Sequence, residues 1–370
     1  MSIYWNERTR RLCPYVPGEQ PKDMKLSGRK LIKLNTNENP YPPSPRVIEA
    51  IQKAAVETLK LYPDPACTEP REAAAARFGL KAGQVFAGNG SDEILAFAFA
   101  AFFGNGSGED AILFPDITYS FYPVYAGLWD TPYKAVPLRE DFSIDKGPYL
   151  EKSGGIIFPN PNAPTGMLLS LEEIRKIAKA AEQNKRVFVL DEAYIAFADG
   201  DAASAISLIN EFPNLLVVRT LSKEASLAGL RAGFALGSGE LIEGLCRIRD
   251  SFNSYTLDRL ALAGAAAALN DSSYYEQINR RIIATRRRLS LDLEALGFRV
   301  LPSQANFIFA SPPPECGKGG LDFYTALRER GILVRHFNKP RIAGFLRISI
   351  GTDDDTDILL EACKEILRGV

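Results

Sequence analysis

Residues 214–231 read Asn-Leu-Leu-Val-Val-Arg-Thr-Leu-Ser-Lys-Glu-Ala-Ser-Leu-Ala-Gly-Leu-Arg, and this stretch decides both the fold class and the kind of site. Its first half is a short apolar run rich in β-branched residues, which predicts a buried strand over 215–219. The chain leaves that strand through Ser222 and Lys223 and reaches Arg231 eight residues later. A lysine amine forms an imine with a carbonyl group, and an arginine binds phosphate. The stretch therefore indicates a site for an imine-forming cofactor that carries a phosphate.

A second apolar run, 187–190, ends in Asp191-Glu-Ala-Tyr194, and a proline-rich loop with Asn162 follows an earlier run. A carboxylate at a strand end can keep a pyridine nitrogen protonated, while an amide and a phenol can bind the ring's oxygen. The carboxyl ends of parallel strands meet at one edge of a sheet, where ligands bind. An aspartate at a strand end is also a common cap, and an asparagine between prolines is a common turn residue. The residues alone leave both interpretations open.

Short apolar runs alternate with helical patterns between residues 45 and 270. This alternation predicts an α/β fold with a mostly parallel sheet whose short strands are buried on both faces. We expect strands over 84–87, 111–114, 155–158, 187–190, 215–219 and 232–236. We expect helices over 45–60, 92–103, 171–184 and 240–268.

The pattern changes after residue 270. A long charged helix over 274–296 is followed by strands over 298–301 and 305–309, a helix over 321–330, strands over 332–335 and 345–350, and a closing helix. This hairpin-like spacing predicts a smaller α+β domain. We expect residues 31–268 to form the large domain. Residues 269–370, together with an N-terminal arm over 1–30 that lies on another surface, form the small domain.

The glycines in Gly88-Asn-Gly-Ser91-Asp92 stand between an expected strand and an expected helix. Glycine lets the backbone approach a ligand, and free N–H groups at a helix start bind phosphate. Ser91 would also serve as an ordinary helix cap, so the motif alone does not choose between the two.

Composition excludes several classes of function. Lys+Arg of 44 against Asp+Glu of 45 gives no basic surface for nucleic acid or for an anionic membrane. The five cysteines form no C-x-x-C pair, and we interpret them as free thiols in a reducing cytoplasm. A single histidine, His336, argues against a histidine zinc site and against Ser-His catalysis, so no metal is expected. We interpret it as a polar residue without a catalytic role.

These segments, in this order, resemble the fold-type I pyridoxal-phosphate aminotransferases of class I/II over nearly the whole chain. More narrowly, the chain is similar to the histidinol-phosphate aminotransferases. The residues that carry the narrower resemblance are Leu34-Asn-Thr-Asn-Glu-Asn39-Pro-Tyr, Tyr62-Pro-Asp, Ser303-Gln-Ala-Asn306-Phe, Leu333-Val-Arg335-His-Phe and Leu346-Arg347-Ile-Ser-Ile-Gly351. The resemblance implies a seven-stranded-type sheet, pyridoxal 5'-phosphate as cofactor, and a homodimer with shared active sites.

The resemblance also implies a role for each candidate residue. The catalytic residues are Lys223, which carries the cofactor and moves protons, Asp191, which pairs with the ring nitrogen, and Tyr194. Further cofactor contacts are Ser91, Asp92, Ser222, Arg231 and the partner's Tyr62 at the phosphate, and Tyr119 and Asn162 at the ring. The substrate contacts are Tyr15, Asn39, Arg335 and Arg347.

The activity that the resemblance implies is amino-group exchange between glutamate and the imidazole-acetol phosphate/histidinol phosphate pair, in histidine biosynthesis. Three alternatives stay open on the sequence alone. They are an aromatic amino acid aminotransferase, a threonine-phosphate decarboxylase on the same fold, and a silent regulatory protein. Intact Lys223, Asp191 and Arg231 argue against the last.

Overall fold

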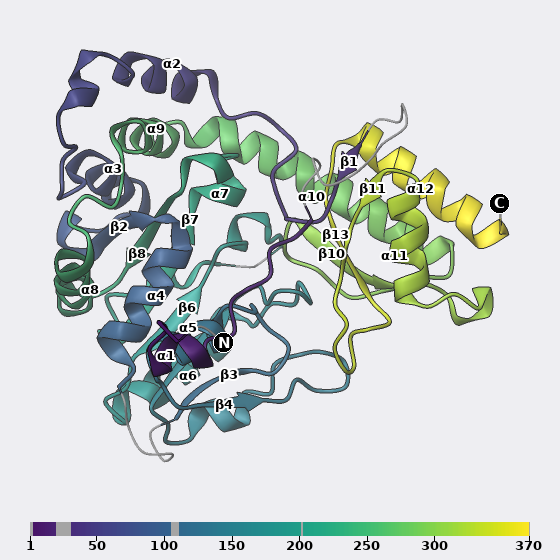
Figure 1. Ribbon diagram of the computed structural model, residues 1–370, viewed down its shortest axis with the longest axis horizontal. Coiled ribbons are helices and arrows are strands. Elements are labelled where there is room, and N and C mark those ends of the chain that lie inside the picture. Colours follow the sequence, from purple (N-terminus) through teal and green to yellow (C-terminus); the bar gives the residue numbers. More distant parts are fainter. Residues whose placement is uncertain (1–2, 20–30, 105–110, 201–202, 370) are drawn as a thin grey trace.

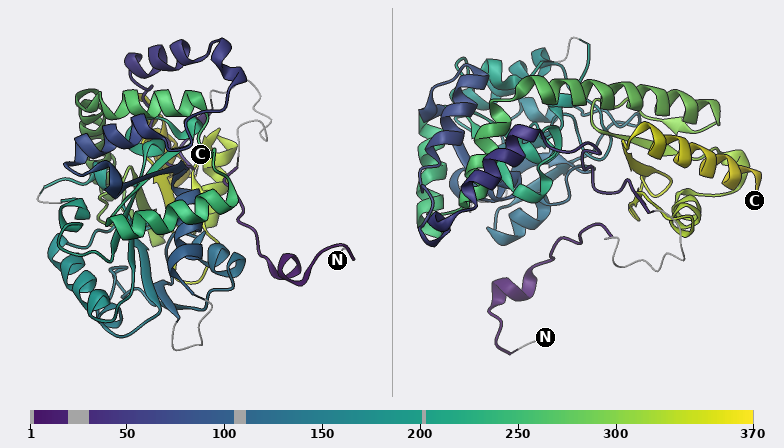
Figure 2. Two further views of the ribbon diagram at one scale, coloured as in Figure 1. Left: turned by 90° about the vertical axis from the view of Figure 1, so that its left-hand side faces the viewer. Right: turned by 90° about the horizontal axis from the view of Figure 1, so that it is seen from above.

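The chain forms a large lobe and a smaller lobe side by side, in a computed structural model that describes residues 3–19, 31–104, 111–200 and 203–369 (Figure 1). The large lobe holds a seven-stranded sheet, and the smaller lobe holds a four-stranded sheet beside a two-stranded one. Helix α10 (Ser272–Ala295) runs from the large lobe into the smaller one in both the front and the top views (Figures 1 and 2).

The large sheet confirms the expected fold class. Its strand order is β2-β8-β7-β6-β5-β3-β4, and only β8 runs antiparallel to its neighbours. The strands are β2 (Val85–Asn89), β3 (Ile112–Pro115), β4 (Tyr133–Val136), β5 (Gly155–Pro159), β6 (Phe188–Asp191), β7 (Leu215–Thr220) and β8 (Ala232–Leu236). Strand β4 was not expected, because three of its four residues are exposed at the sheet's edge and give no apolar run.

Helices cover both faces of this sheet. Successive side chains of each strand point to opposite faces, so every strand packs against both layers of helices. In β7, Leu215 and Val217 pack in one apolar cluster, while Leu216 and Val218 pack in another. The first cluster includes side chains of α3, α6 and α9, and the second includes those of α4, α5 and α8. The strands are therefore continuous apolar runs rather than alternating ones.

The four helices expected in the large lobe begin within about two residues of their expected starts, whereas α3, α5 and α7 were not expected. They are α2 (Pro45–Ala54), α3 (Thr68–Phe78), α4 (Gly90–Phe102), α5 (Tyr122–Leu128), α6 (Leu171–Gln183), α7 (Leu221–Glu224), α8 (Gly239–Phe252) and α9 (Arg259–Leu269). Short 3-10 turns are Glu57–Lys60, Ala82–Gln84, Gly147–Leu150, Ile195–Phe197, Ala205–Leu208, Ala228–Leu230 and, in the small lobe, Pro314–Cys316.

Two expected helices are each divided. The helix expected over 45–60 ends at Ala54, and the one expected over 240–268 is broken between α8 and α9. The second break has a local cause, because the Asp258 side chain accepts hydrogen bonds from the backbone N–H groups of Leu260 and Ala261 and so begins a new helix.

The smaller lobe has its own apolar cluster, which supports the expected α+β character. Its antiparallel sheet has the order β12-β13-β10-β9, covered by α10, α11 (Gly320–Glu329) and α12 (Asp353–Arg368). The strands are β9 (Arg299–Val300), β10 (Phe307–Ser311), β12 (Arg335–His336) and β13 (Leu346–Ser349). The strand expected over 332–335 is divided between two sheets, since β11 (Ile332–Leu333) pairs instead with β1 (Ile32–Lys33).

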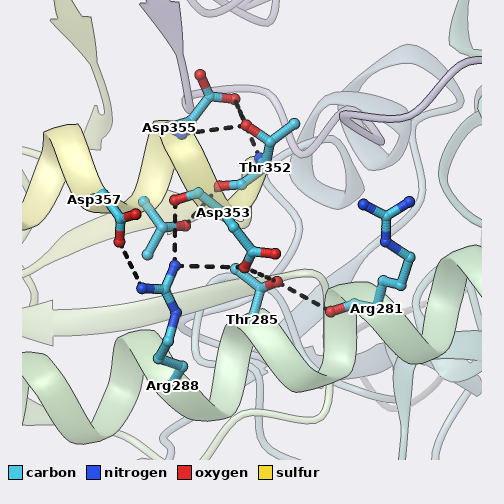
Figure 3. Close-up of polar contacts among 8 residues, drawn as sticks. Arg281, Thr285, Arg288, Thr352, Asp353, Asp355 and Asp357 are labelled. Carbon is cyan, nitrogen blue, oxygen red and sulfur yellow. Dashed lines mark hydrogen bonds and ion pairs between the residues drawn. The ribbon is translucent and has the colours of Figure 1, made fainter.

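Polar contacts fix the start of α12 against α10 (Figure 3). Thr352 and Asp355 form a capping box, which satisfies backbone N–H groups at the helix start. From α10, Arg288 pairs with Asp357 at 2.5 Å, and Thr285 donates a hydrogen bond to Asp353 at 2.9 Å. The small lobe is thus held to the long helix as one packed unit.

The N-terminal arm lies at the periphery of the large lobe. Helix α1 (Glu7–Arg11) stands away from the body of the protein in both further views (Figure 2) and is tied to it through Arg8, which pairs with Asp130 at 3.0 Å. The rest of the expected arm, residues 20–30, lies outside the described residues. No helix among the described residues is long and apolar enough to cross a membrane.

Candidate active site

Most of the candidate residues line one cavity, although they come from segments far apart in the sequence. The cavity lies where β6 and β7 end, beside the start of α4, and β12 and β13 of the smaller lobe also contribute to it. The candidates that line it are Tyr15, Ser91, Asp92, Tyr119, Asp191, Tyr194, Ser222, Lys223, Arg231, Arg335 and Arg347.

Lys223 lies on the one-turn helix α7 directly after β7, so its side chain leaves the sheet at the carboxyl edge. Its Nζ donates a hydrogen bond to the carbonyl oxygen of Thr36 at 3.0 Å. Burial, with further repulsion from Arg347, lowers the pKa of Lys223 from 10.5 to about 8. About a tenth of the amine is therefore neutral at pH 7, and the neutral form is the one that attacks a carbonyl.

Asp191 is the last residue of β6 and is only 4% exposed. Burial raises the pKa of its carboxyl from 3.8 to about 7. It accepts hydrogen bonds from the backbone N–H of Ala193 at 3.1 Å and from the hydroxyl of Tyr122 at 3.4 Å. Among the described residues no lysine or arginine forms an ion pair with it. This buried carboxyl thus lacks the cation that would stabilise its charge.

The start of α4 brings free backbone N–H groups next to Arg231. Gly90 has φ +74°, and a Cβ on it would lie 2.4 Å from Nη2 of Arg231, so only glycine fits here. The guanidinium donates to the Ser222 hydroxyl at 3.2 Å and pairs with the Asp92 carboxylate at 3.2 Å. Helix N–H groups, a hydroxyl and a guanidinium together form a site for an anion such as phosphate.

Two contacts at this anion site were not expected. Thr220, the last residue of β7, donates from its hydroxyl to that of Ser222 at 3.0 Å, and it also lines the cavity. The carboxylate of Asp92 accepts a hydrogen bond from Tyr119 at 2.6 Å, whereas only its backbone N–H was expected to take part. The Asp92 side chain therefore links the aromatic wall of the cavity to Arg231.

Arg335 and Arg347 lie directly opposite each other in the β12–β13 pair. Like charges in directly opposed positions of an antiparallel pair repel. Arg347 donates to the carbonyl of Asn35 at 2.9 Å, but its buried Nε has no partner among the residues that the structure describes, and burial lowers the pKa of the guanidinium. An anionic ligand between these guanidiniums would relieve the repulsion and satisfy the free donor.

The N-terminal arm covers the outer side of this arginine pair. Arg335 donates to the carbonyl oxygens of Val16 at 3.3 Å and Pro17 at 3.4 Å. Tyr15 stacks on Phe121, with 4.3 Å between ring centroids. The arm therefore forms one wall of the cavity. Tyr15, which the sequence predicts to contact the substrate, lies in this wall.

Three candidates do not line the cavity. Asn162 is fully buried, and its amide donates to the backbone carbonyl of Ile117, which follows β3, and to the hydroxyl of Thr165 in its own loop. Asn39 donates to the backbone carbonyl of Lys223 at 3.0 Å, so it supports the lysine's segment. Tyr62 is 78% exposed and stacks on Tyr255 on the surface.

The single histidine, His336, also lies outside the cavity, where its Nε2 lies 2.8 Å from the carbonyl oxygen of Ala343.

Comparison with known proteins identifies the family. A model of class I and II aminotransferases matches residues 29–363. The chain belongs to the class I and II aminotransferase family. Among this family's members, the histidinol-phosphate aminotransferase of Clostridium acetobutylicum is 52% identical to this chain, over 99% of this chain and 100% of that protein. Histidinol-phosphate aminotransferase 1 of Bordetella parapertussis is 53% identical, over 99% of each.

A solved structure of this aminotransferase family shares the fold over the full length. The histidinol-phosphate aminotransferase of Sinorhizobium meliloti, in complex with pyridoxal-5'-phosphate, aligns with a TM-score of 0.86 and 26% identity. The alignment covers 100% of this chain and 99% of that one. The two-lobe arrangement is therefore that of an aminotransferase of this family.

Proposed function

We propose that this chain is a histidinol-phosphate aminotransferase that uses pyridoxal 5'-phosphate. It exchanges an amino group between glutamate/2-oxoglutarate and the histidinol phosphate/imidazole-acetol phosphate pair, as a step of histidine biosynthesis. The observation that carries the proposal is the opposed pair Arg335 and Arg347 beside the buried amine of Lys223. The full-length identity of about half to proteins with this name supports the same substrate class.

The residues around the cavity fit pyridoxal 5'-phosphate. Asp191 is a buried carboxyl that pairs with no cation among the described residues. A protonated ring nitrogen would supply that cation. The start of α4, together with Ser222 and Arg231, would hold the phosphate. Tyr119 would lie against the ring, and Tyr194 would donate to its oxygen. Asn162 would reach the same oxygen only by giving up the contact of its amide with Ile117 or Thr165. When bound, the cofactor supplies an electron sink for the charge left when a proton leaves the substrate carbon.

The protein's own residues then have separate tasks. Nζ of Lys223 removes the proton from the substrate carbon that bears the amine and returns a proton during transfer. Arg347 and Arg335 bind the anionic group of the substrate, which is a carboxylate in glutamate and a phosphate in histidinol phosphate. A guanidinium matches both groups through paired N–H donors. Tyr15, from the N-terminal arm, and Asn39, which donates to the backbone of Lys223, are the remaining proposed substrate contacts.

We also propose a homodimer in which Tyr62 reaches the phosphate bound by the partner. Its 78% exposure supports a role outside its own chain. We place the protein in the cytoplasm, without a nucleic-acid or membrane partner, which five free cysteines support. Residues 31–268 are proposed as the large domain, and 1–30 with 269–370 as the small one, with two exceptions: β1 pairs with β11 of the smaller lobe, and α1 contacts the large lobe.

The proposal is tested with a substrate panel. Purified protein is assayed with 2-oxoglutarate as acceptor and with histidinol phosphate, phenylalanine or threonine phosphate as the second substrate. The expected result is the highest kcat/KM for histidinol phosphate. A preference for phenylalanine would assign the chain to aromatic amino acids instead, and carbon dioxide release from threonine phosphate would make it a decarboxylase. Borohydride reduction followed by peptide mapping checks the site separately, and the label is expected on Lys223.

A further inference from the structure

The segment over residues 35–39 connects the two lobes at the cavity, and no role was expected for most of it. Its hydrogen bonds reach three of the residues assigned to the site: Arg347, Lys223 and Tyr194. The first two contacts use backbone carbonyl groups. Asn39 also donates from its side chain, but to the backbone carbonyl of Lys223. The contact of Asn37 with Tyr194 joins two side chains, so a substitution at position 37 changes it directly.

Asn37 is buried, and both its backbone and its side chain form hydrogen bonds. It is 1% exposed and has φ +54°, a left-handed conformation that asparagine tolerates better than most residues. Its backbone N–H donates to the hydroxyl oxygen of Ser349 at 2.8 Å, and its carbonyl accepts from Asn306 at 3.0 Å. Its side chain meets Ser349 on one side, at 3.0 Å, and the hydroxyl of Tyr194 on the other, also at 3.0 Å.

These contacts fix which end of the amide faces Tyr194. The oxygen of Ser349 already accepts the backbone N–H of Asn37, so its hydroxyl hydrogen needs an acceptor. Oδ1 of Asn37 is that acceptor, which turns the NH2 group toward Tyr194. The opposite orientation would leave the Ser349 hydrogen without a partner in a buried place.

An amide NH2 group can only donate, so the Tyr194 oxygen must accept from Asn37. The hydroxyl hydrogen of Tyr194 therefore points elsewhere, and Tyr194 lines the cavity. Accepting one hydrogen bond also makes a hydroxyl a better donor. We propose that Asn37 is a positioning residue, which aims the hydroxyl hydrogen of Tyr194 at the ring oxygen of the bound cofactor. This inference rests on the proposed function.

The proposal predicts an effect that a purely structural role would not produce. A hydrogen bond from Tyr194 stabilises negative charge on the cofactor's oxygen and so weakens that oxygen as a base. Losing the bond should raise the pH at which the visible absorbance of the bound cofactor titrates. Hydrogen bonds to charged groups correspond to a change on the order of 1 to 2 pH units.

Two substitutions at position 37 suit the left-handed backbone. Asn37→Asp keeps the shape but replaces the NH2 donor by an acceptor, so Tyr194 would donate to it instead. Asn37→Gly removes the side chain without adding charge. Asn35→Asp is the matched control, because it adds the same charge two residues away and also replaces an amide donor, which here faces the backbone carbonyl of Glu19 rather than Tyr194. Thermal melts of all variants report folding separately.

The measurement is a pH titration of the visible absorbance of each protein loaded with pyridoxal 5'-phosphate. Tyr194→Phe and Asn37→Asp should both raise the titration midpoint by about 1 to 2 pH units. Asn35→Asp should raise it less than Asn37→Asp does. Asn37→Gly should raise it in the wild-type background and leave it unchanged in the Tyr194→Phe background, since residues that act through one another are not additive.

Equal shifts from Asn37→Gly in both backgrounds would overturn the proposal, because Asn37 would then act independently of Tyr194. So would Asn37→Asp and Asn35→Asp shifts of equal size. An unchanged midpoint in Tyr194→Phe would overturn it as well, because Tyr194 would then not reach the ring oxygen. Failure of the proposed function looks different: the wild-type protein would bind no cofactor at Lys223.

Discussion

Replacing Asp191 by asparagine should stabilise the protein when it is free of cofactor, although the same change should destroy activity. The carboxyl is buried without a cation, and its pKa rises on folding from 3.8 to about 7. A group with a raised pKa contributes its full stability below pH 3.8 and loses it as the pH rises through 7. At 1.36 kcal/mol per pKa unit, the ionised carboxylate costs about 4 kcal/mol at pH 8.

The asparagine variant avoids this cost, and its side chain fits the same contacts. Its amide oxygen accepts from the backbone N–H of Ala193, and its NH2 group donates to the hydroxyl of Tyr122. We expect the variant to gain about 2 to 4 kcal/mol at pH 8 and nothing below pH 4. Urea denaturation of cofactor-free wild type and variant, across pH 4 to 8, measures the difference.

The neighbouring Glu192 provides the control. It is equally buried, but it pairs with Arg219 at 3.7 Å and accepts from the backbone of Ala205 at 2.7 Å. Glu192→Gln should therefore gain less than Asp191→Asn does, because Arg219 offsets part of the cost of the buried charge although burial still raises the pKa of the Glu192 carboxyl. An Asp191→Asn gain that is absent, or that is the same at pH 4 and pH 8, would refute the idea of an unpaired buried carboxylate. With cofactor bound, the order of stability of wild type and variant should reverse.

Three further predictions concern the anion sites and the subunit contact. Arg347→Lys should lower kcat/KM for the phosphorylated substrate by about 10- to 150-fold, as steady-state kinetics can measure, since it loses a paired hydrogen bond to charge. Gly90→Ala should weaken cofactor binding at least tenfold in an equilibrium titration, because its Cβ would displace the Arg231 guanidinium. Mixed Lys223→Ala and Tyr62→Ala subunits should recover about a quarter of wild-type activity after re-pairing, because each hybrid dimer has one intact site. Activity no higher than that of the unmixed variants would argue against shared sites.

The strand-end residues of the site were predictable from sequence because of how parallel sheets are buried. The strands ending at Asp191 and before Lys223 are apolar on both faces, so polar residues mark their ends clearly. The contact of Lys223 with Thr36 and that of Tyr194 with Asn37 had no such signal. They join residues 187 and 157 positions apart, and nothing periodic in a short polar segment indicates its distant partner. The resemblance drew attention to the segment, but only Asn39 received a role.

The errors in the predicted secondary structure have similar physical causes. Strand β4 is an edge strand with exposed residues, and edge strands carry little hydrophobic signal. The break between α8 and α9 was not predicted, because both helices are apolar on one side and the signal for a new helix start is a single capping residue, Asp258. Residues 332–335 read as one strand, although the chain changes sheets within them, which only tertiary pairing reveals.

Helix α10 has a mechanical consequence, because it is continuous between the lobes. At its middle, Arg286 donates to the carbonyl oxygens of Phe197 in the large lobe and Ala305 in the smaller one. A tilt about this point would move the helix as a stiff lever about 36 Å long, at 1.5 Å per residue. A tilt of about 5° moves an end by roughly 1.5 Å, which is enough to make or break a hydrogen bond. We therefore expect the contact between Arg347 and a substrate to depend on a few degrees of tilt of α10 relative to the large lobe. Structures with and without substrate would measure that tilt.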